Sequence, residues 1–286
     1  MLQVFDNTPC ALGEGPLWHP QREQLFWFDI IGKALYTRQT NTLRRWSFDE
    51  CVSAAGWIDR DTLLIASESN LLRFDILSGK TKIIHPLESN NPSTRSNDGR
   101  ADPWGGFWVG TMGKQAEPNA GSIYRYYQGK LRLLTGGVTI PNALCFAPDR
   151  SCAYYADTAH RIIWRQPLET LHGWPKGRPE VFVDLRDEEL NPDGAVCDAD
   201  GNLWNAQWGA SRIAQYSPHG DFITAIVAPT QQVSCPAFGG VNFSTLFVTT
   251  AQQIISNQQP AHEFAGRTFF IETEIKGHPE YRVILD

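Results

Sequence analysis

Four carboxylate and amide side chains are the residues of this sequence best suited to do chemistry together. Each directly precedes a small residue and lies shortly before an apolar run, in the pairs Glu14-Gly15, Asp98-Gly99, Asn142-Ala143 and Asp193-Gly194. Such dipeptides are also ordinary turn formers, and one of them alone would need no other explanation. Their matched distance from the following apolar runs instead favours a shared site.

If these side chains converge, their negative charges must be balanced by a positive charge. Buried carboxylates repel one another unless a cation lies between them. A ligand set made only of oxygen atoms favours hard cations such as Ca²⁺, Mg²⁺ or Mn²⁺. Zinc would bind there without its usual nitrogen or sulfur ligands. We therefore expect one divalent metal ion, with calcium as the first candidate.

The elements that must position these residues form a sixfold repeat. Six short apolar or aromatic runs each follow a turn rich in Pro, Asp or Gly, and their middle residues are 26, 64, 108, 154, 204 and 247. The intervals are 38, 44, 46, 50 and 43 residues, close to the length of one propeller blade of four strands. We predict an all-β protein with one domain, residues 1–286, folded as a six-bladed β-propeller. A β-sandwich, the alternative, would not require matched intervals.

The repeat also predicts where the polar residues lie. The innermost strand of a blade begins beside the central channel, some 10–12 residues before the middle of the next strand. Counting back reaches Glu14, Asp98, Asn142 and Asp193 in four units, and Ser53 and Pro236 in the other two. A strand at Leu2–Phe5 is expected to pair into the last blade and close the ring.

Composition excludes several other classes of protein. The chain of 286 residues has a formal net charge of -6 and no basic run, which argues against binding nucleic acid. No segment has the ~20 apolar residues of a membrane span, and the N-terminus does not resemble a secretory signal. The six cysteines contain no C-x-x-C pair, which favours a reducing cytoplasm. We expect a monomer or a small homo-oligomer.

Four segments of the sequence resemble signature segments of the SMP-30/gluconolactonase family, in the family's order and spacing. They are Leu12-Gly13-Glu14-Gly15-Pro16-Leu17-Trp18, Arg95-Ser96-Asn97-Asp98-Gly99, Pro141-Asn142-Ala143-Leu144 and Pro192-Asp193-Gly194. The resemblance implies a six-bladed propeller that holds one divalent cation and hydrolyses sugar lactones. It assigns the metal to Glu14, Asn142 and Asp193, and substrate hydroxyl groups to Arg95 and Asn97. A further substrate-binding Glu is matched by Glu117, in a loop before Gly121.

The residue types suit lactone hydrolysis. A divalent cation can stabilise the oxyanion that develops at the lactone carbonyl, and the attacking water must lose a proton. Asp193 is the candidate catalytic base, whereas Arg95 can only donate hydrogen bonds and is expected to bind substrate.

Two alternatives share the fold. One is a calcium-dependent hydrolase of aryl esters or organophosphates, and the other is a propeller that binds a ligand without catalysis. The sequence contains neither a G-x-S-x-G elbow nor a Walker loop. The loops at 88–97, 113–120 and 185–193 are expected to decide which sugar lactone is bound.

Overall fold

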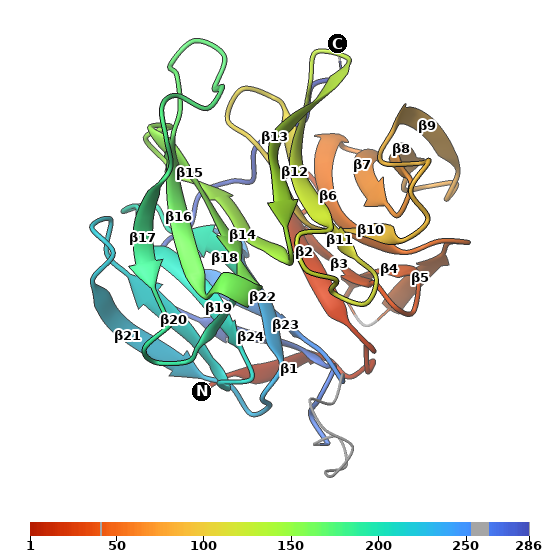
Figure 1. Ribbon diagram of the computed structural model, residues 1–286. Coiled ribbons are helices and arrows are strands. Elements are labelled where there is room, and N and C mark those ends of the chain that lie inside the picture. The colour runs from red at the N-terminus through yellow and green to blue at the C-terminus, as the bar shows by residue number, and fades with distance from the viewer. Residues whose placement is uncertain (41, 253–262, 286) are drawn as a thin grey trace.

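Six antiparallel sheets of four strands surround a central channel in the computed structural model, which describes residues 1–40, 42–252 and 263–285 (Figure 1). The six-bladed β-propeller is thus confirmed.

We number the blades by their order in the chain and give the strands from the channel outward. Blade 1 contains β2 (Gly13–His19), β3 (Gln24–Asp29), β4 (Ala34–Gln39) and β5 (Thr42–Ser47). Blade 2 contains β6 (Val52–Asp59), β7 (Thr62–Ser67), β8 (Asn70–Asp75) and β9 (Thr81–Pro86). Blade 3 contains β10 (Thr94–Ala101), β11 (Phe107–Gly113), β12 (Gly121–Tyr127) and β13 (Lys130–Val138).

The second half of the chain repeats this order. Blade 4 contains β14 (Pro141–Phe146), β15 (Cys152–Asp157), β16 (Ile162–Pro167) and β17 (Glu180–Asp184). Blade 5 contains β18 (Asn191–Cys197), β19 (Leu203–Trp208), β20 (Arg212–Tyr216) and β21 (Phe222–Val227). Blade 6 contains β22 (Val233–Gly239), β23 (Thr245–Thr250), β24 (Thr268–Glu272) and, from the N-terminus, β1 (Gln3–Asp6). Residues 26, 64, 108, 154, 204 and 247 all lie on second strands, as the repeat predicts.

The ring is closed by the pairing of β1 with β24. The two strands are antiparallel, with Gln3 opposite Phe270 and Val4 opposite Phe269. This confirms the predicted closure, which joins the first residues of the chain to its last blade and covers an edge that would otherwise remain unpaired.

Aspartate side chains shape several turns between first and second strands. Asp102 Oδ1 accepts the backbone N–H groups of Trp104 at 2.8 Å and Gly106 at 3.0 Å. Asp198 Oδ1 does the same for Asp200 and Asn202 at 3.0 and 2.9 Å. A short carboxylate that bonds to backbone two residues ahead favours a tight turn. These turns lie at the end of the channel away from the predicted site.

Aromatic residues fill the space between neighbouring blades. Trp108 packs edge-on against Phe146 of the next blade, with ring centroids 5.4 Å apart. Trp204 packs against Phe238 in the same way at 6.1 Å. Because each blade buries its faces against two neighbours, the inner strands form a rigid frame for side chains that face the channel.

The only helix among the described residues is a single 3₁₀ turn, η1 (Thr158–His160), between β15 and β16. Within these residues, no helix has the length and apolar character needed to cross a membrane. All six cysteines carry free thiols.

Candidate active site

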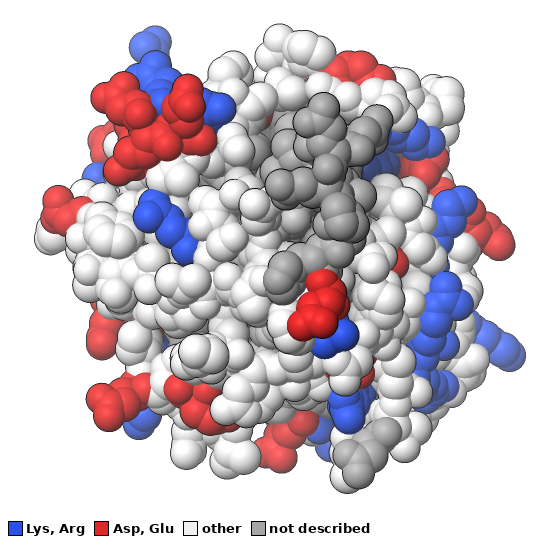
Figure 2. Space-filling model, turned by 90° about the horizontal axis from the view of Figure 1, so that it is seen from below, with Lys and Arg blue, Asp and Glu red and all other residues white. Residues whose placement is uncertain are grey.

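Five of the six predicted site residues line one pocket of about 320 Å³ at one end of the channel. They are Glu14 on β2, Arg95 and Asn97 on β10, Asn142 on β14 and Asp193 on β18. Their exposed fractions lie between 3% and 7%. Figure 2 shows the face of the ring on which the pocket opens, where charged side chains lie mostly around the edge. Four blades therefore contribute polar groups to one buried place.

A β-bulge turns the backbone in each of the four strands that bring these residues together. The ladder is interrupted between Glu14 and Leu17, Ser96 and Gly99, Asn142 and Cys145, and Pro192 and Ala195. A bulge leaves residues unpaired and redirects their side chains. Bulges are common next to active sites for that reason.

The small residues beside the site are required by close approach of the backbones. Gly15 has φ +52°, and a Cβ on it would lie 2.2 Å from the carbonyl oxygen of Ser53. A Cβ on Gly194 would lie 2.3 Å from Cys235 Sγ. A small residue at each of these two positions therefore lets the inner strands approach closely.

Two aspartates that were not predicted from the sequence hold the backbone segments that precede two of the site strands, β2 and β14. Asp29, the last residue of β3, accepts the N–H groups of Ala11 at 2.9 Å and Leu12 at 3.0 Å. Asp157, the last residue of β15, accepts those of Thr139 at 2.9 Å and Ile140 at 3.0 Å. Each carboxylate thus holds the segment that leads to Glu14 or Asn142. The sequence signal is an aspartate ending an apolar run in two repeat units.

A chain of hydrogen bonds determines how the Asn142 amide is oriented. The Thr158 hydroxyl donates to the carbonyl oxygen of Pro192 at 2.6 Å, so its oxygen must accept from the Asn142 Nδ2 group at 2.8 Å. Asn142 Oδ1 therefore faces the other way and accepts from Asn97 Nδ2 at 3.0 Å. Asn97 Oδ1 in turn accepts from Arg95 Nη1 at 2.9 Å. The network presents a fixed carbonyl oxygen beside the two carboxylates.

The carboxylates are in an environment that disfavours their negative charge. Burial, reinforced by the charge of Asp98, raises the pKa of Glu14 to about 8. Burial and the charges of Glu14 and Asp98 raise the pKa of Asp193 well above its usual range. Among the described residues, the donors to these carboxylates are backbone N–H groups, from Gly15 to Glu14 and from Gly194 to Asp193. Both groups have oxygen lone pairs available. In the described part of the chain neither forms an ion pair, and the nearby charge of Arg95 lowers their pKa values by less than burial raises them.

This donor set fits a divalent cation that prefers oxygen ligands. The described residues contain no cluster of three or more His, Cys, Asp and Glu arranged for a metal. The set here is instead two carboxylates and one amide oxygen, from Glu14, Asp193 and Asn142. Such a set suits Ca²⁺, Mg²⁺ or Mn²⁺. A bound cation would also relieve the repulsion between the buried carboxylates.

Asp98 does not lie where the repeat count places it. β10 begins at Thr94, so Asp98 is its fifth residue, and Asn97 occupies the pocket position instead. The Asp98 carboxylate accepts the N–H groups of Gly99 at 2.8 Å and Leu144 at 2.7 Å. The expectation that four oxygen ligands converge is corrected in this respect, because Asp98 is deeper in the channel and satisfied by backbone donors.

Glu117 is also outside the pocket. Its side chain lies on the exposed loop between β11 and β12, where Oε2 accepts the N–H of Gln115 at 3.0 Å. Lys114, Gln115 and Ala116 of the same loop line the pocket in its place. The predicted loop thus lines the pocket while Glu117 itself does not, because spacing from Gly121 does not determine which side chain of a loop turns inward.

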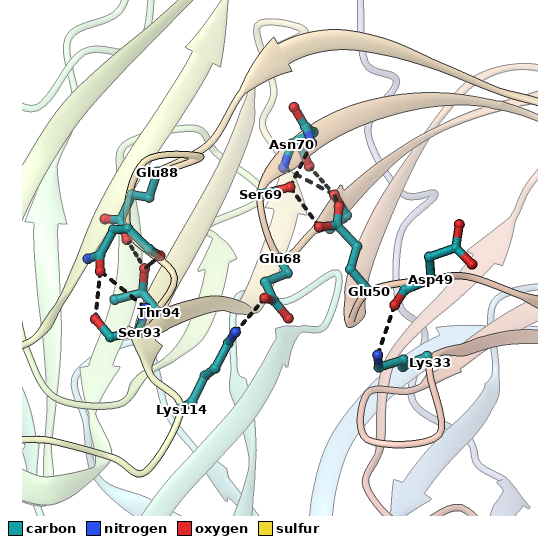
Figure 3. Close-up of polar contacts among 12 residues, drawn as sticks. Lys33, Asp49, Glu50, Glu68, Ser69, Asn70, Glu88, Ser93, Thr94 and Lys114 are labelled. Atoms are coloured by element: carbon teal, nitrogen blue, oxygen red, sulfur yellow. Dashed lines mark hydrogen bonds and ion pairs between the residues drawn. The ribbon is translucent and has the colours of Figure 1, made fainter.

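The rim between blades 2 and 3 is built from further ion pairs and hydrogen bonds (Figure 3). Lys114 forms an ion pair with Glu68 across the two blades. Glu88 accepts the hydroxyl groups of Thr94 at 2.6 Å and Thr111 at 2.9 Å. Since Thr94 precedes Arg95, this carboxylate fixes the start of the strand that carries Arg95 and Asn97.

The pocket is lined by a polar set and an apolar set of side chains. Arg95, Asn97, Lys114 and Gln115 form the first, and Leu12, Ile31, Met112, Ile140 and Trp208 form the second. A larger groove of about 650 Å³ opens at the other end of the ring, between the turns at 147–151 and 199–201. It contains none of the predicted site residues, so we assign the chemistry to the smaller pocket.

Known proteins resemble this chain along nearly its whole length. Residues 12–252 match the family model described as SMP-30/Gluconolactonase/LRE-like region. A protein of Rhizobium meliloti (strain 1021), named provisionally as a sugar lactone lactonase, is 39% identical over 98% of this chain and 97% of its own. The L-arabinolactonase of Azospirillum brasilense is 34% identical, over 96% of this chain and 92% of its own. The crystal structure of a calcium-binding protein, regucalcin, from Agrobacterium tumefaciens str. C58 has a TM-score of 0.96 at 37% identity. The superposition covers 100% of this chain and 98% of the regucalcin chain.

Proposed function

The chain belongs to the SMP-30/gluconolactonase/LRE-like family, and on that premise we propose that it hydrolyses a sugar lactone to the corresponding aldonic acid. The observation that carries the proposal is the convergence of Glu14, Asn142 and Asp193 with Arg95 and Asn97 on one pocket. The proposal is further supported by relatives named for the hydrolysis of sugar lactones.

Glu14, Asn142 and Asp193 would hold the divalent cation. When bound, the ion withdraws charge from the lactone carbonyl oxygen and makes water more acidic. The hydrogen bond from Asn142 Nδ2 to Thr158 keeps the amide oxygen of Asn142 available for this role. An all-oxygen set suits hard cations, and calcium is the first candidate because the similar regucalcin of Agrobacterium tumefaciens is described as calcium-binding. Magnesium, manganese and zinc are the alternatives.

Asp193 is assigned as the base that accepts a proton from the attacking water. Its carboxylate lies at the pocket wall and receives only a backbone N–H from Gly194 among the described residues. One of its two oxygens can face the cation while the other accepts the proton. The amide of Asn205 bonds to the backbone carbonyl of Asp193 at 2.9 Å and so fixes the main chain from which the base extends.

Arg95 is assigned to substrate oxygen atoms. In the described part of the chain its guanidinium bonds only through Nη1, to Ser96 O at 2.8 Å and Asn97 Oδ1 at 2.9 Å. Nε and Nη2 therefore remain free to donate. A sugar lactone offers hydroxyl edges to such donors and apolar C–H faces to apolar side chains of the lining such as Trp208. The pocket volume of about 320 Å³ is near the lower end of small-molecule sites.

A panel of γ- and δ-aldonolactones tests the proposal, with acid release followed by a pH indicator. We expect turnover of at least one sugar lactone, its loss in excess chelator and its recovery when Ca²⁺ or Mn²⁺ is added back. Phenyl acetate and an aryl phosphotriester in the same assay test the alternative of an aryl-ester or organophosphate hydrolase. Lactone binding without turnover at any metal concentration would refute the enzymatic proposal.

The six free thiols support placing the protein in a reducing compartment such as the cytoplasm.

A further inference from the structure

The C-terminal segment, residues 273–285, crosses the end of the channel opposite the pocket, and we call it the strap. Its backbone is tied to turns and strands of four different blades. The hydrogen-bonded pairs are Lys276 with Ala199, Gly277 with Phe243, Val283 with Trp57 and Ile284 with Gly105. Val283 is completely buried against blades 2 and 3. The strap is thus an ordered part of the ring that closes its far end.

Glu280 extends from the strap into the channel. Its carboxylate forms an ion pair with Arg100 of β10, in which the two side chains are only 8% and 10% exposed. The Glu280 carbonyl oxygen accepts the Trp57 Nε1 group at 2.7 Å, which fixes the backbone at this point. A buried ion pair needs such additional bonds to hold its geometry.

Arg100 connects this ion pair to the strands of the proposed cation site. Its Nε donates to Leu144 O at 3.1 Å, and its Nη2 donates to Ala195 O at 3.1 Å. Leu144 and Ala195 lie two residues after Asn142 and Asp193, at the bulges that direct those side chains. The planar guanidinium therefore links β10, β14 and β18 directly beneath the pocket.

Glu280 and Arg100 also affect the proposed cation site through their charges. Asp98 shares the small space around Arg100 and Glu280, and it accepts the N–H of Leu144 at 2.7 Å. If Glu280 lost its charge, Arg100 would keep only Asp98 as its neighbouring carboxylate, and the space below the ion-binding carboxylates would become more positive by one charge. The added positive charge would oppose the binding of a cation above it.

We propose that Glu280 is a positioning residue for the cation site, acting through Arg100 on the bulges of β14 and β18. This inference rests on the proposed function, since it assumes that Glu14, Asn142 and Asp193 hold a divalent ion. Partners one layer outside a metal site generally change ion affinity or activity by about 10–100-fold when they are removed.

The test compares Glu280→Gln with Val283→Ala, a matched variant of the same strap. Glu280→Gln retains the shape of the side chain and removes its charge. Val283→Ala loosens the packing of the strap and leaves the ion pair in place. Ca²⁺ and Mn²⁺ are titrated separately into each chelator-treated protein by calorimetry, and kcat and KM are measured for the lactone that turns over.

We expect Glu280→Gln to weaken ion binding about 10–100-fold and to lower kcat at fixed subsaturating ion, with KM for the lactone nearly unchanged. Val283→Ala should lower Tm while ion affinity stays within about twofold of wild type. Unchanged ion affinity in Glu280→Gln, or equal weakening in both variants, would overturn the proposal.

If Glu280→Gln does not fold, the same ion titrations are performed on Arg100→Lys. It retains the charge, but an ammonium cannot reproduce the flat fork that reaches Leu144 O and Ala195 O together. Wild-type ion affinity in Arg100→Lys would overturn the positioning role. Failure of the wild-type protein to bind either ion would instead remove the proposed function on which the inference rests.

Discussion

The two ends of the channel are lined by the same six strands, yet the buried charged groups of the described residues differ in whether they form an ion pair. At the pocket end, Glu14 and Asp193 are buried with backbone N–H groups as their donors among the described residues. At the strap end, Arg100 bonds to a carboxylate and to two carbonyl oxygens. Buried charged groups normally find partners, so two buried carboxylates without an ion pair in the described part of the chain indicate a place where a ligand could complete the structure.

Strand β2 contains the same contrast within seven residues. Glu14 near its beginning has a raised pKa and an available carboxylate. His19 at its end is completely buried, and its Nε2 lies 3.0 Å from the carbonyl oxygen of Asp59. Burial lowers the pKa of His19, so the ring is held neutral. The first residue is expected to serve binding and the second only folding.

Asp193→Asn is the change expected to have the largest effect on activity. The variant retains an oxygen ligand but removes the negative charge and the base, so kcat should fall by about 10²–10⁴-fold even at saturating ion. Folding should be preserved, because the substitution removes one of the buried negative charges that repel one another, those of Glu14, Asp98 and Asp193. Steady-state kinetics at increasing Ca²⁺ and thermal unfolding in chelator provide the measurements.

Asp98→Asn is the matched control for that variant. Asp98 belongs to the same ring of strands, but both of its oxygens already accept backbone N–H groups. Turning one oxygen into an NH₂ group would place it against a donor, so this variant should lose stability. A metal-saturated Asp193→Asn enzyme with near wild-type kcat would contradict the base assignment and the contrast drawn between the two residues.

Arg95→Ala should have the next largest effect, mainly on KM. Hydrogen bonds to a charged group are worth about 1.5–3 kcal/mol, which corresponds to a rise in KM of about 10–100-fold if the contacts are equal in ground and transition states. Arg95→Lys, which retains charge but not the bond geometry, should be intermediate. A fall in kcat larger than the rise in KM would show that Arg95 instead acts on the developing oxyanion.

The sequence could predict the repeat because each blade contributes a similar apolar second strand, and strand periodicity is local. It could also predict Glu14, Asn142 and Asp193, since they share one phase with those strands. The repeat count could not distinguish Asn97 from Asp98, because the bulge in β10 that decides between them has no signature of its own. Only the family resemblance selected Asn97. One residue of register reverses the direction of a side chain.

Other parts of the site depend on contacts between distant segments. Glu280 and Arg100 are 180 residues apart, and the strap lies outside the repeat that organises the rest of the chain. Gln115 rather than Glu117 lines the pocket because of how one loop folds back on itself. Neither arrangement leaves a periodic pattern, so both required the three-dimensional structure.

His19→Gln should change the pH dependence of stability without changing turnover. The folded-state pKa of His19 is lowered, so the unfolded chain takes up a proton that the folded chain rejects, and wild-type stability should decline as pH falls below about 6.5. The slope from one such group is at most about 1.4 kcal/mol per pH unit. Glutamine can still donate to Asp59 O but does not titrate.

Urea unfolding of wild type and His19→Gln between pH 7.5 and 5.5 measures this difference. The variant should have the flatter profile, and kcat at pH 7.5 should match that of wild type. Parallel profiles would contradict the view that the buried ring of His19 stays neutral in the folded protein.

Ser53→Ala should have the smallest effect. It tests whether the position of a residue in the repeat is enough for a role in the site, or whether its polar group must also lack a protein partner. The repeat count places Ser53 in blade 2 where Glu14 lies in blade 1, but its hydroxyl already donates to Ser96 Oγ at 2.7 Å. Loss of this bond should cost about 1 kcal/mol of unfolding free energy, because Ser96 can still donate to Ala66 O at 3.4 Å. Since Ser53 does not line the pocket, kcat and ion affinity should remain within about twofold of wild type. If Ser53→Ala lowered ion affinity as strongly as a change at Glu14, proximity to the pocket end alone would determine function, and unmet bonding capacity would lose its value as a marker of the site.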